Sequence, residues 1–269
     1  MRLIQLSDPH LIARRGLVSG RLDTVAALTR TVARIADLRV KVGPVAGLLV
    51  TGDVTDDGDP ASYALFRQIV DPLGLPLLAI PGNHDAREAM RAAFADTGLM
   101  PKTGPLDWVR DLPGLRVVGL DTLIEGQGGG ALGEGTLAFL ARALETAPPG
   151  PILVALHHPP FASGVRFMDR LGLSNAAALG KVLRGSGREG RVVCGHIHCM
   201  QLATVGGWPA LSAPATCSTF DVDFRDDAPV GFFEDSGGFL LHDWQNGLRT
   251  HRVPTACGDG PYPFAPDAG

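Results

Sequence analysis

Five short polar segments of the sequence each follow a run of apolar residues. They are SDPH (7–10), TGDVTDDG (51–58), PGNHD (81–85), LHHPP (156–160) and CGHIH (194–198). These segments contain six of the eight histidines, together with aspartate and asparagine side chains. Carboxylate oxygens, amide oxygens and imidazole nitrogens are ligands that suit Zn, Mn and Fe. The residue types therefore indicate a metal site, provided that the fold brings the five segments together.

Each polar segment also has an ordinary structural interpretation. Residues 8–10 could form a turn after a strand, and residues 82–85 could cap a helix, a role that Asn and Asp fill well. Residues 52–53 could begin a loop whose aspartate caps the helix region that starts at Pro60. Residues 157–160 could form a rigid turn, and residues 195–198 could be an edge strand with two imidazoles on one face. Five such coincidences in one chain are far less plausible than a single shared site, so the joint pattern favours metal binding.

Strand-like and helix-like segments alternate over the first 200 residues. The predicted strands are 2–6, 45–50, 76–80, 115–120, 152–156 and 191–194, and the predicted helices are 22–42, 60–70, 86–95, 136–144 and 175–183. Such alternation is typical of a layered α/β fold. In these folds ligand sites form outside the carboxyl ends of the strands. The five polar segments are therefore expected to converge at that edge.

The pattern changes after His198. Segments 202–205, 210–212, 231–234, 238–244 and 248–253 look like short strands without helices between them. We expect a single domain over residues 1–255, with an α/β part (1–200) and a β-rich part (201–255). The β-rich part is expected to form a second, more antiparallel sheet or an edge packed on the first. Residues 256–269 are rich in Pro and Gly and are expected to form an extended or disordered tail. The glycine-rich segment 125–135 lacks a phosphate-loop pattern and is expected to be a flexible loop.

Composition limits the possible partners. The chain has 269 residues, 45% hydrophobic and 19% charged, with a net charge of −4. This acidic balance argues against a nucleic-acid polymer as partner, since such binding needs a basic face. No apolar run approaches the ~20 residues of a membrane span, and the first residues do not resemble a secretory signal. The four cysteines lack paired C-x-x-C spacing, so we expect reduced thiols, no zinc ribbon and a cytoplasmic protein.

Taken together, the motifs resemble the calcineurin-like metallophosphoesterase family. The pattern consists of D-x-H, G-D-x-x-D-x-G, G-N-H-D, a His after a strand, and G-H-x-H, and it extends over residues 1 to about 200. The residues of the segments SDPH, PGNHD, LHHPP and CGHIH are similar to those of the branch that contains class III cyclic-nucleotide phosphodiesterases and glycerophosphodiesterases. The resemblance implies a four-layer α/β/β/α sandwich, in which two mixed β-sheets are flanked by helices.

The resemblance also implies two transition-metal ions, divalent or trivalent, drawn from Fe, Mn, Zn and Co. Each ion would have four protein ligands, with Asp53 shared by both. The first set would be Asp8, His10, Asp53 and His198, and the second would be Asp53, Asn83, His157 and His196. Two such ions about 3.5–4 Å apart can clamp a phosphoryl group and activate a water molecule.

Further residues are candidates for roles beside the metals. His84 follows a predicted ligand directly and could stabilise the transition-state charge or protonate the leaving group. Asp56 matches the family position that hydrogen-bonds this histidine. The alternative for His84 is a helix-cap spectator. Candidates for the substrate rim are His158, Phe161, Arg166 and Asn175, for which an ordinary surface loop is the alternative.

The predicted function is hydrolysis of a small phosphodiester by a metal-held hydroxide. The substrate would be a 3′,5′-cyclic nucleotide or a glycerophosphodiester. The alternative is a phosphomonoesterase that acts on nucleotides or phosphoproteins, because both reactions need the same metal clamp. A non-catalytic scaffold is disfavoured by the intact ligand set, and a nuclease by the acidic composition. The β-rich part and the tail could also form a contact between copies in a homo-oligomer.

Overall fold

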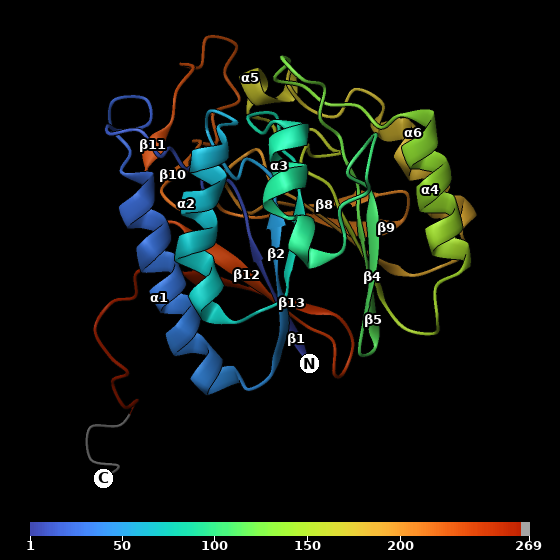
Figure 1. Cartoon of the computed structure of the whole chain (residues 1–269), viewed down its shortest axis with the longest axis horizontal. Coiled ribbons are helices and arrows are strands. Elements are labelled where there is room, and N and C mark those ends of the chain that lie inside the picture. Colours follow the sequence, from blue (N-terminus) through green and yellow to red (C-terminus); the bar gives the residue numbers. More distant parts are fainter. Residues whose placement is uncertain (265–269) are drawn as a thin grey trace.

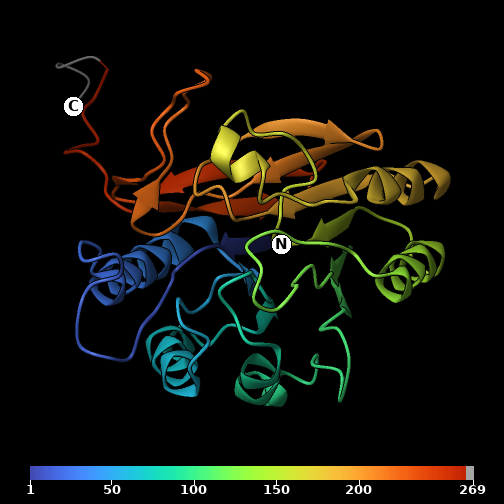
Figure 2. The same ribbon diagram turned by 90° about the horizontal axis from the view of Figure 1, so that it is seen from above.

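The computed structural model describes residues 1–264 and contains two β-sheets with helices on their outer faces. Figure 1 shows α1 and α2 on one side of the molecule and α4 and α6 on the other, and Figure 2 shows the same arrangement from above. An apolar core lies between the sheets, and a further core lies under the helices of each sheet. The predicted four-layer α/β/β/α sandwich is therefore confirmed.

The first sheet has the strand order β13-β12-β1-β2-β3. Strands β1, β2 and β3 are parallel, whereas β12 and β13 are antiparallel to their neighbours. Helices α1, α2 and α3 cover its outer face. The bounds are β1 (Arg2–Leu6), β2 (Val45–Thr51), β3 (Leu77–Ile80), β12 (Gly238–Asp243), β13 (Arg249–Pro254), α1 (Thr24–Val42), α2 (Pro60–Val70) and α3 (Arg87–Ala93), with short 3-10 turns at Asp71–Leu73 and Ala95–Thr97.

The second sheet has the order β4-β5-β6-β7-β9-β8, with α4 and α6 on its outer face. Strands β5, β6, β7 and β9 are parallel, and the two edge strands are antiparallel. A separate two-stranded ribbon, β10-β11, stands apart from both sheets. The bounds are β4 (Trp108–Leu112), β5 (Leu115–Gly119), β6 (Ile152–Ala155), β7 (Gly190–Cys194), β8 (Leu202–Val205), β9 (Trp208–Ser212), β10 (Ser218–Thr219), β11 (Phe233–Glu234), α4 (Glu134–Glu145), α5 (Arg166–Asp169) and α6 (Ala176–Gly185).

Local capping explains where the first helices begin. Helix α1 begins at Thr24 rather than at residue 22, because the Asp23 side chain accepts a hydrogen bond from the backbone N–H of Ala26 at 2.9 Å. Helix α2 begins at Pro60, as predicted, after an Asp59 cap. An N-cap carboxylate satisfies an amide that has no partner inside the helix, so each helix is fixed at the residue that follows its aspartate.

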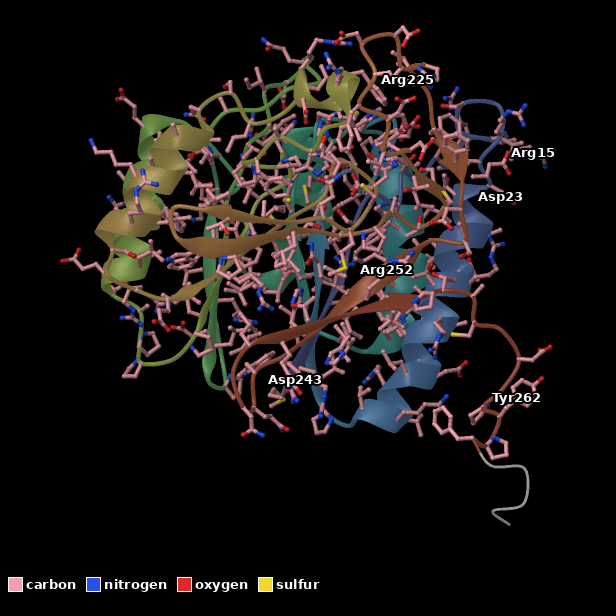
Figure 3. All side chains as sticks on the ribbon, turned by 180° about the vertical axis from the view of Figure 1, so that it is seen from behind. Arg15, Asp23, Arg225, Asp243, Arg252 and Tyr262 are labelled. Carbon is pink, nitrogen blue, oxygen red and sulfur yellow. The ribbon has the colours of Figure 1, made fainter. Side chains whose placement is uncertain are left out.

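The C-terminal strands do not form a sheet of their own, apart from the β10-β11 ribbon. Strands β8 and β9 extend the second sheet, whereas β12 and β13 extend the first (Figure 3). The reason lies in β12, all six residues of which are buried because the strand lies between β1 and β13. The predicted tail contains no helix or strand up to residue 264, and its last five residues lie outside the described part. Within residues 1–264, no helix has the length and apolar character to cross a membrane.

A buried histidine links the two C-terminal strands of the first sheet to β1. His242 is fully buried, with Nε2 3.0 Å from Gln5 Oε1 and Nδ1 2.8 Å from Thr250 Oγ1. Arg191 also donates to the Thr250 hydroxyl. Burial, and then the charge of Arg191, lower the pKa of His242 to about 3. The imidazole is therefore neutral in the folded protein at every pH above that value.

This histidine should make the fold sensitive to acid. In the unfolded chain it takes up a proton near its ordinary pKa of about 6.5, whereas the folded protein resists protonation down to about pH 3. The contribution to stability is thus complete above about pH 6.5 and is lost as the pH falls, by at most about 1.4 kcal/mol per pH unit. Between pH 7 and pH 4, the free energy of unfolding measured with urea should fall less steeply for His242→Gln than for the wild type. His251→Gln, at an exposed position on β13, is the matched control and should retain the wild-type slope. Equal slopes for all three proteins would contradict the prediction.

Candidate metal centre

The five polar segments follow β1, β2, β3, β6 and β7, so both sheets contribute to one site. Backbone hydrogen bonds join these segments beyond the strand ends: Asp8 N donates to Gly52 O at 3.1 Å, and Gly195 N donates to His157 O at 3.0 Å. The Asp8 carboxylate also accepts from the backbone N–H of His196 at 3.0 Å. The expected convergence at the carboxyl ends of the strands is present.

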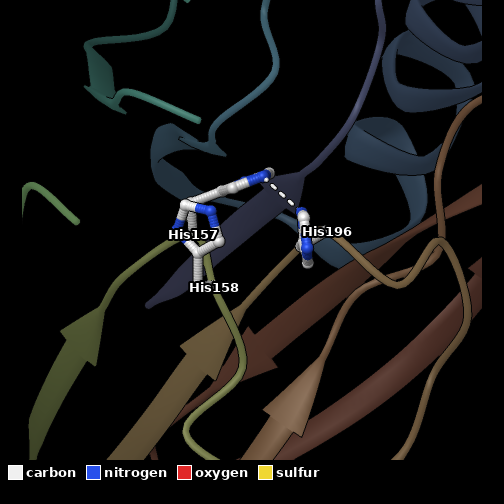
Figure 4. Close-up of side chains that lie close together, drawn as sticks. All are labelled: His157, His158 and His196. Atoms are coloured by element: carbon white, nitrogen blue, oxygen red, sulfur yellow. Dashed lines mark hydrogen bonds between the residues drawn. The ribbon is translucent and has the colours of Figure 1, made fainter. Parts of the chain in front are cut away.

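The second predicted ligand set meets at one atom, Nε2 of His157. This atom lies 3.2 Å from Asn83 Oδ1 and 3.4 Å from Asp53 Oδ2. It also lies 3.2 Å from Nδ1 of His196, and Figure 4 shows these two imidazoles together with His158. The Nδ1 atom of His157 is 2.8 Å from the backbone carbonyl of Thr51, to which it can donate its proton. That contact directs Nε2 toward the other three residues of the set.

The first predicted set is similarly compact. Nε2 of His10 lies 3.2 Å from Nε2 of His198 and 3.5 Å from Asp53 Oδ2, and Nε2 of His198 lies 3.6 Å from Asp8 Oδ1. Donor atoms of Asp8, His10 and His198 all lie within 4.8 Å of one another. Asp53 Oδ2 is close to both His10 and His157, so this carboxylate is placed between the two sets.

Unusual backbone conformations are concentrated in these residues. Among the described residues, six that are not glycine have a positive φ, and five of them are predicted metal ligands. The five are Asp8 (51°), His10 (46°), Asp53 (47°), His196 (71°) and His198 (53°). Such conformations cost of order 1–3 kcal/mol each and cluster at functional sites. The fold thus accepts local strain in order to direct these side chains into the site.

Two glycines allow the segments to approach one another closely. A Cβ added at Gly82 would lie 2.1 Å from Asp53 Oδ1, and one at Gly195 would lie 2.1 Å from Ser7 Oγ. Neither position could accept a side chain without movement of the groups around the site. These contacts explain why the third and fifth polar segments each have a glycine before their first metal-ligand candidate.

Burial and neighbouring charge set the protonation of the site. Burial lowers the pKa of His196 and of His198 well below the ordinary value, so both imidazoles are neutral. Burial also acts to lower the pKa of His157, but the Asp53 and Asp8 carboxylates outweigh it and raise that pKa to about 9. Burial, opposed by His157, raises the pKa of Asp8 to about 6. The free site therefore contains neutral His196 and His198, in the metal-binding form, beside a protonated His157 that is paired with the buried carboxylates.

The donor set fits metal ions. Asp8 and Asp53 are almost fully buried, and within the described residues their only ion-pair partners are histidines, never Lys or Arg. Buried carboxylates require a compensating charge, and a metal ion can supply it in place of the proton on His157. Oxygen and imidazole donors suit Fe, Mn, Zn and Co alike.

His84 and Asp56 lie beside the first ligand set. Nδ1 of His84 is 3.1 Å from the Asp56 backbone carbonyl and 3.4 Å from its carboxylate, and 40% of the His84 side chain is exposed. Asp56 Oδ1 also lies 3.1 Å from Nδ1 of His10. Asp56 thus contacts both histidines, so it can orient a predicted ligand as well as the candidate catalytic residue.

The four rim candidates lie in different surroundings. His158 is fully buried, with its two ring nitrogens 2.8 Å from Thr122 Oγ1 and 3.2 Å from the Gly128 carbonyl. Asn175 uses both ends of its amide on the backbone of Leu132. These two side chains therefore fasten the glycine-rich loop beside the site. Phe161 is partly buried against the apolar cluster of Val165, Met168 and Ile197.

Arg166 is the remaining rim candidate and has an open position. Its side chain is 51% exposed and pairs with Asp226, and its Nε donates to the Phe224 carbonyl at 3.2 Å. It lines a cavity of about 450 Å³ between α5 and the segment 221–233. A ligand in this cavity would therefore meet the Arg166 charge beside that of Asp226.

Asp85 holds two segments of the site together, a role that was not predicted from the sequence. Its carboxylate accepts hydrogen bonds from the backbone of Gly82, Val54 and Thr55 and from the Tyr63 hydroxyl at 2.8 Å. It thereby fastens the segment after β3 to the segment after β2. Its place at the end of PGNHD was the available signal, because a carboxylate there can cap amides of the same turn.

Comparison with known proteins identifies this arrangement. The family model for calcineurin-like phosphoesterases matches residues 1–200, about three quarters of the chain and all five polar segments. The chain belongs to the calcineurin-like phosphoesterase family. Within this family the edge where the segments converge is the expected place for the metal ions, and the family assignment agrees with the predicted resemblance.

Several relatives match between 81% and 100% of this chain. A probable glycerophosphodiester phosphodiesterase of Arcobacter nitrofigilis is 31% identical over 100% of this chain and 98% of its own. A cAMP/cGMP dual specificity phosphodiesterase of Mycobacterium tuberculosis is 32% identical, over 96% of this chain and 80% of its own. A 3′,5′-cyclic adenosine monophosphate phosphodiesterase of Pseudomonas aeruginosa is 36% identical, over 81% and 77%.

Solved structures agree on the calcineurin-like fold at low sequence identity. A dimetal phosphatase from Danio rerio superposes with a TM-score of 0.66 at 13% identity, over 95% of this chain and 96% of its own. GAP50, described as the anchor in the inner membrane complex of Plasmodium, gives 0.65 at 16% identity, over 97% and 87%. One of these names refers to an enzyme and the other to an anchor, so activity has to be argued from the site.

Proposed function

We propose that this protein is a dinuclear metal-dependent phosphodiesterase that hydrolyses small phosphodiesters. The proposed ligand sets are those described above, with Asp53 shared. The observation that carries the proposal is the position of Asp53 Oδ2, 3.5 Å from His10 and 3.4 Å from His157. A buried carboxylate between two groups of metal-binding side chains is the arrangement that two neighbouring ions require.

When bound, the two ions would lower the pKa of a water molecule toward neutrality and offset charge on the phosphoryl oxygens. The chain's own residues would complete the site. His84 can donate its Nδ1 proton to the Asp56 carbonyl, which leaves Nε2 for the substrate. A protonated His84 would stabilise negative charge that develops on the phosphoryl group, or give its proton to the departing alkoxide.

The relatives support a diester substrate. The three whose identities are given above are named for glycerophosphodiester or cyclic-nucleotide hydrolysis, and the proposed substrate class follows those names. Asn83 contributes an uncharged oxygen to the proposed centre. A phosphomonoesterase would need the same centre, so the metal ligands do not separate the two activities.

A pair of chromogenic substrates tests the proposal. The protein is stripped of metal, reconstituted with Mn²⁺, and assayed with bis(p-nitrophenyl) phosphate and with p-nitrophenyl phosphate. We expect hydrolysis that depends on added metal and a higher kcat/KM for the diester. A higher kcat/KM for the monoester would favour the phosphatase alternative, and no metal-dependent turnover of either compound would favour a scaffold. Cyclic AMP and glycerophosphoethanolamine, assayed next, would separate the two diester classes.

A further inference from the structure

His198 is held by residues that lie beyond the part of the chain that matches the family. The match ends at residue 200, whereas Ser218 and Phe220 come later in the sequence. Ser218 Oγ lies 2.8 Å from Nδ1 of His198. The Phe220 ring stacks on the same imidazole, with 4.7 Å between ring centroids and 23° between the planes. Two neighbouring side chains thus contact one edge and one face of a predicted metal ligand.

We propose that Ser218 and Phe220 are positioning residues that prepare His198 for metal binding, an inference that rests on the proposed metal centre. Nε2 of His198 faces the first ligand set, 3.2 Å from Nε2 of His10 and 3.6 Å from Asp8. If Nδ1 carries the ring proton and donates it to the Ser218 hydroxyl, Nε2 keeps a lone pair directed at that set. The Phe220 ring, stacked on the His198 imidazole, restricts rotation of that imidazole.

The β10-β11 ribbon, which contains Ser218 and is followed directly after β10 by Phe220, is itself anchored near His10. Cys217, which precedes Ser218, is buried in a small apolar cluster with Ile12, Val18 and Leu22, and Phe232 packs against this cluster. Arg21 and Glu234 form an ion pair at 3.5 Å across the same contact. The loop that follows His10 and the ribbon that holds His198 therefore support each other.

A third aromatic ring extends this support to the rim. Phe167 of α5 contacts the Phe220 ring edge-on, with centroids 5.2 Å apart and planes at 85°. Phe220 and Phe167 belong to the cluster of Val165, Met168 and Ile197, and Ile197 lies between His196 and His198. The stacked ring is thus part of a packed unit rather than a free surface side chain.

The support is specific to one side of the centre. Ser218 and Phe220 contact His198, whereas His157 in the second set is oriented by the Thr51 carbonyl. Loss of the serine hydroxyl should therefore weaken binding of one ion and leave the other. Loss of such an outer hydrogen-bond partner lowers metal affinity by about 10–100-fold.

Titration of the full-length metal-free protein with Mn²⁺, followed by calorimetry, tests the proposal. Ser218→Ala should weaken one of two binding events by about 10–100-fold, and Ser218→Thr, which keeps a hydroxyl, should restore most of the affinity. Thr219→Ala is the matched control, since Thr219 is the next residue on β10 and has no contact with His198 among the described hydrogen bonds and ring contacts. Phe220→Leu keeps apolar bulk but removes the flat ring, and should weaken the same event.

The outcomes separate positioning from stability and from catalysis. Wild-type affinity for both ions in Ser218→Ala would overturn the proposal. So would equal weakening of both ions together with a lower unfolding temperature of the metal-free protein, because that result indicates a structural role. If Ser218→Ala does not fold, Phe220→Leu decides by the same criteria. Turnover of the diester by the wild type is measured separately, so a protein that binds both ions without hydrolysis would refute the proposed function alone.

Discussion

Asp53→Asn should abolish most of the diesterase activity by removing the charge shared between the two metal sites. The amide can still accept the hydrogen bond that Asp53 Oδ1 receives from the backbone of His84 at 2.9 Å, so the local shape is preserved. The position of Asp53 Oδ2, 3.5 Å from His10 Nε2 and 3.4 Å from His157 Nε2, would then be occupied by a group without a negative charge. Metal ions contribute several kcal/mol to such reactions, which corresponds to a loss of about 10³-fold in kcat/KM.

Metal content and stability distinguish this effect from misfolding. We expect fewer than two Mn²⁺ ions per Asp53→Asn chain by elemental analysis. The metal-free variant should remain folded but unfold at a lower temperature than the wild type, because the neighbouring His157 outweighs burial and holds the pKa of Asp53 well below its usual value, and the amide loses this pairing. Asp57→Asn is the matched control, an exposed carboxylate in the same loop, and should retain both ions and full turnover. Two tightly bound ions in Asp53→Asn would refute the shared-ligand assignment.

The sequence predicted the strands and helices that have strong local signals. Residues 60–70 were predicted as a helix and form α2 with the same bounds, because Asp59 and Pro60 fix its first turn. Strand β4 was missed, since its sequence WVRDL mixes apolar and charged residues at a sheet edge. Helix α5 was missed because four residues are too few to show a helical period.

The site was predictable to the extent that its residues lie in motifs. Each predicted metal ligand follows a strand at a recognisable spacing, and the shared edge of the sheets follows from the α/β pattern. Asp56 was expected to contact His84, but its contact with His10 depends on the curvature of a loop. Ser218 and Phe220 have no spacing signal, because they reach His198 through long-range packing, of Cys217 against residues 12–22 and of Phe220 against Phe167 and Ile197.

The local sequence also contains no signal for which sheet the last two strands, β12 and β13, join. Periodicity indicated strands at 238–244 and 248–253 but could not say which sheet they extend. The choice is made by β1, which pairs with β12 through Leu3 and His242, and by the Gln5 contact with that histidine. Long-range pairing of this kind is decided by side chains more than two hundred residues apart, and a local pattern contains no information about it.

His84→Ala should retain both metal ions and lose turnover by about 10²–10⁴-fold, the usual contribution of a positioned acid or base. His84 is not in either proposed ligand set, although its ring lies 4.7 Å from that of His10 and its donor atoms are within 4.8 Å of His10 and Asp53. Metal analysis is therefore the first measurement, and an ion lost from His84→Ala would show that this histidine is a ligand instead. His251→Ala, at an exposed strand position, is the control for loss of an imidazole.

The choice of leaving group then separates the two roles proposed for His84. A proton donor matters most when the departing oxygen is a poor leaving group, such as an alkoxide, and little when it is p-nitrophenolate. His84→Ala should therefore lose much more activity toward an alkyl diester than toward bis(p-nitrophenyl) phosphate if the imidazole protonates the leaving group. Equal losses would assign it to stabilisation of charge on the phosphoryl oxygens. Full turnover of both substrates by a metal-replete variant would leave His84 as a spectator held by Asp56.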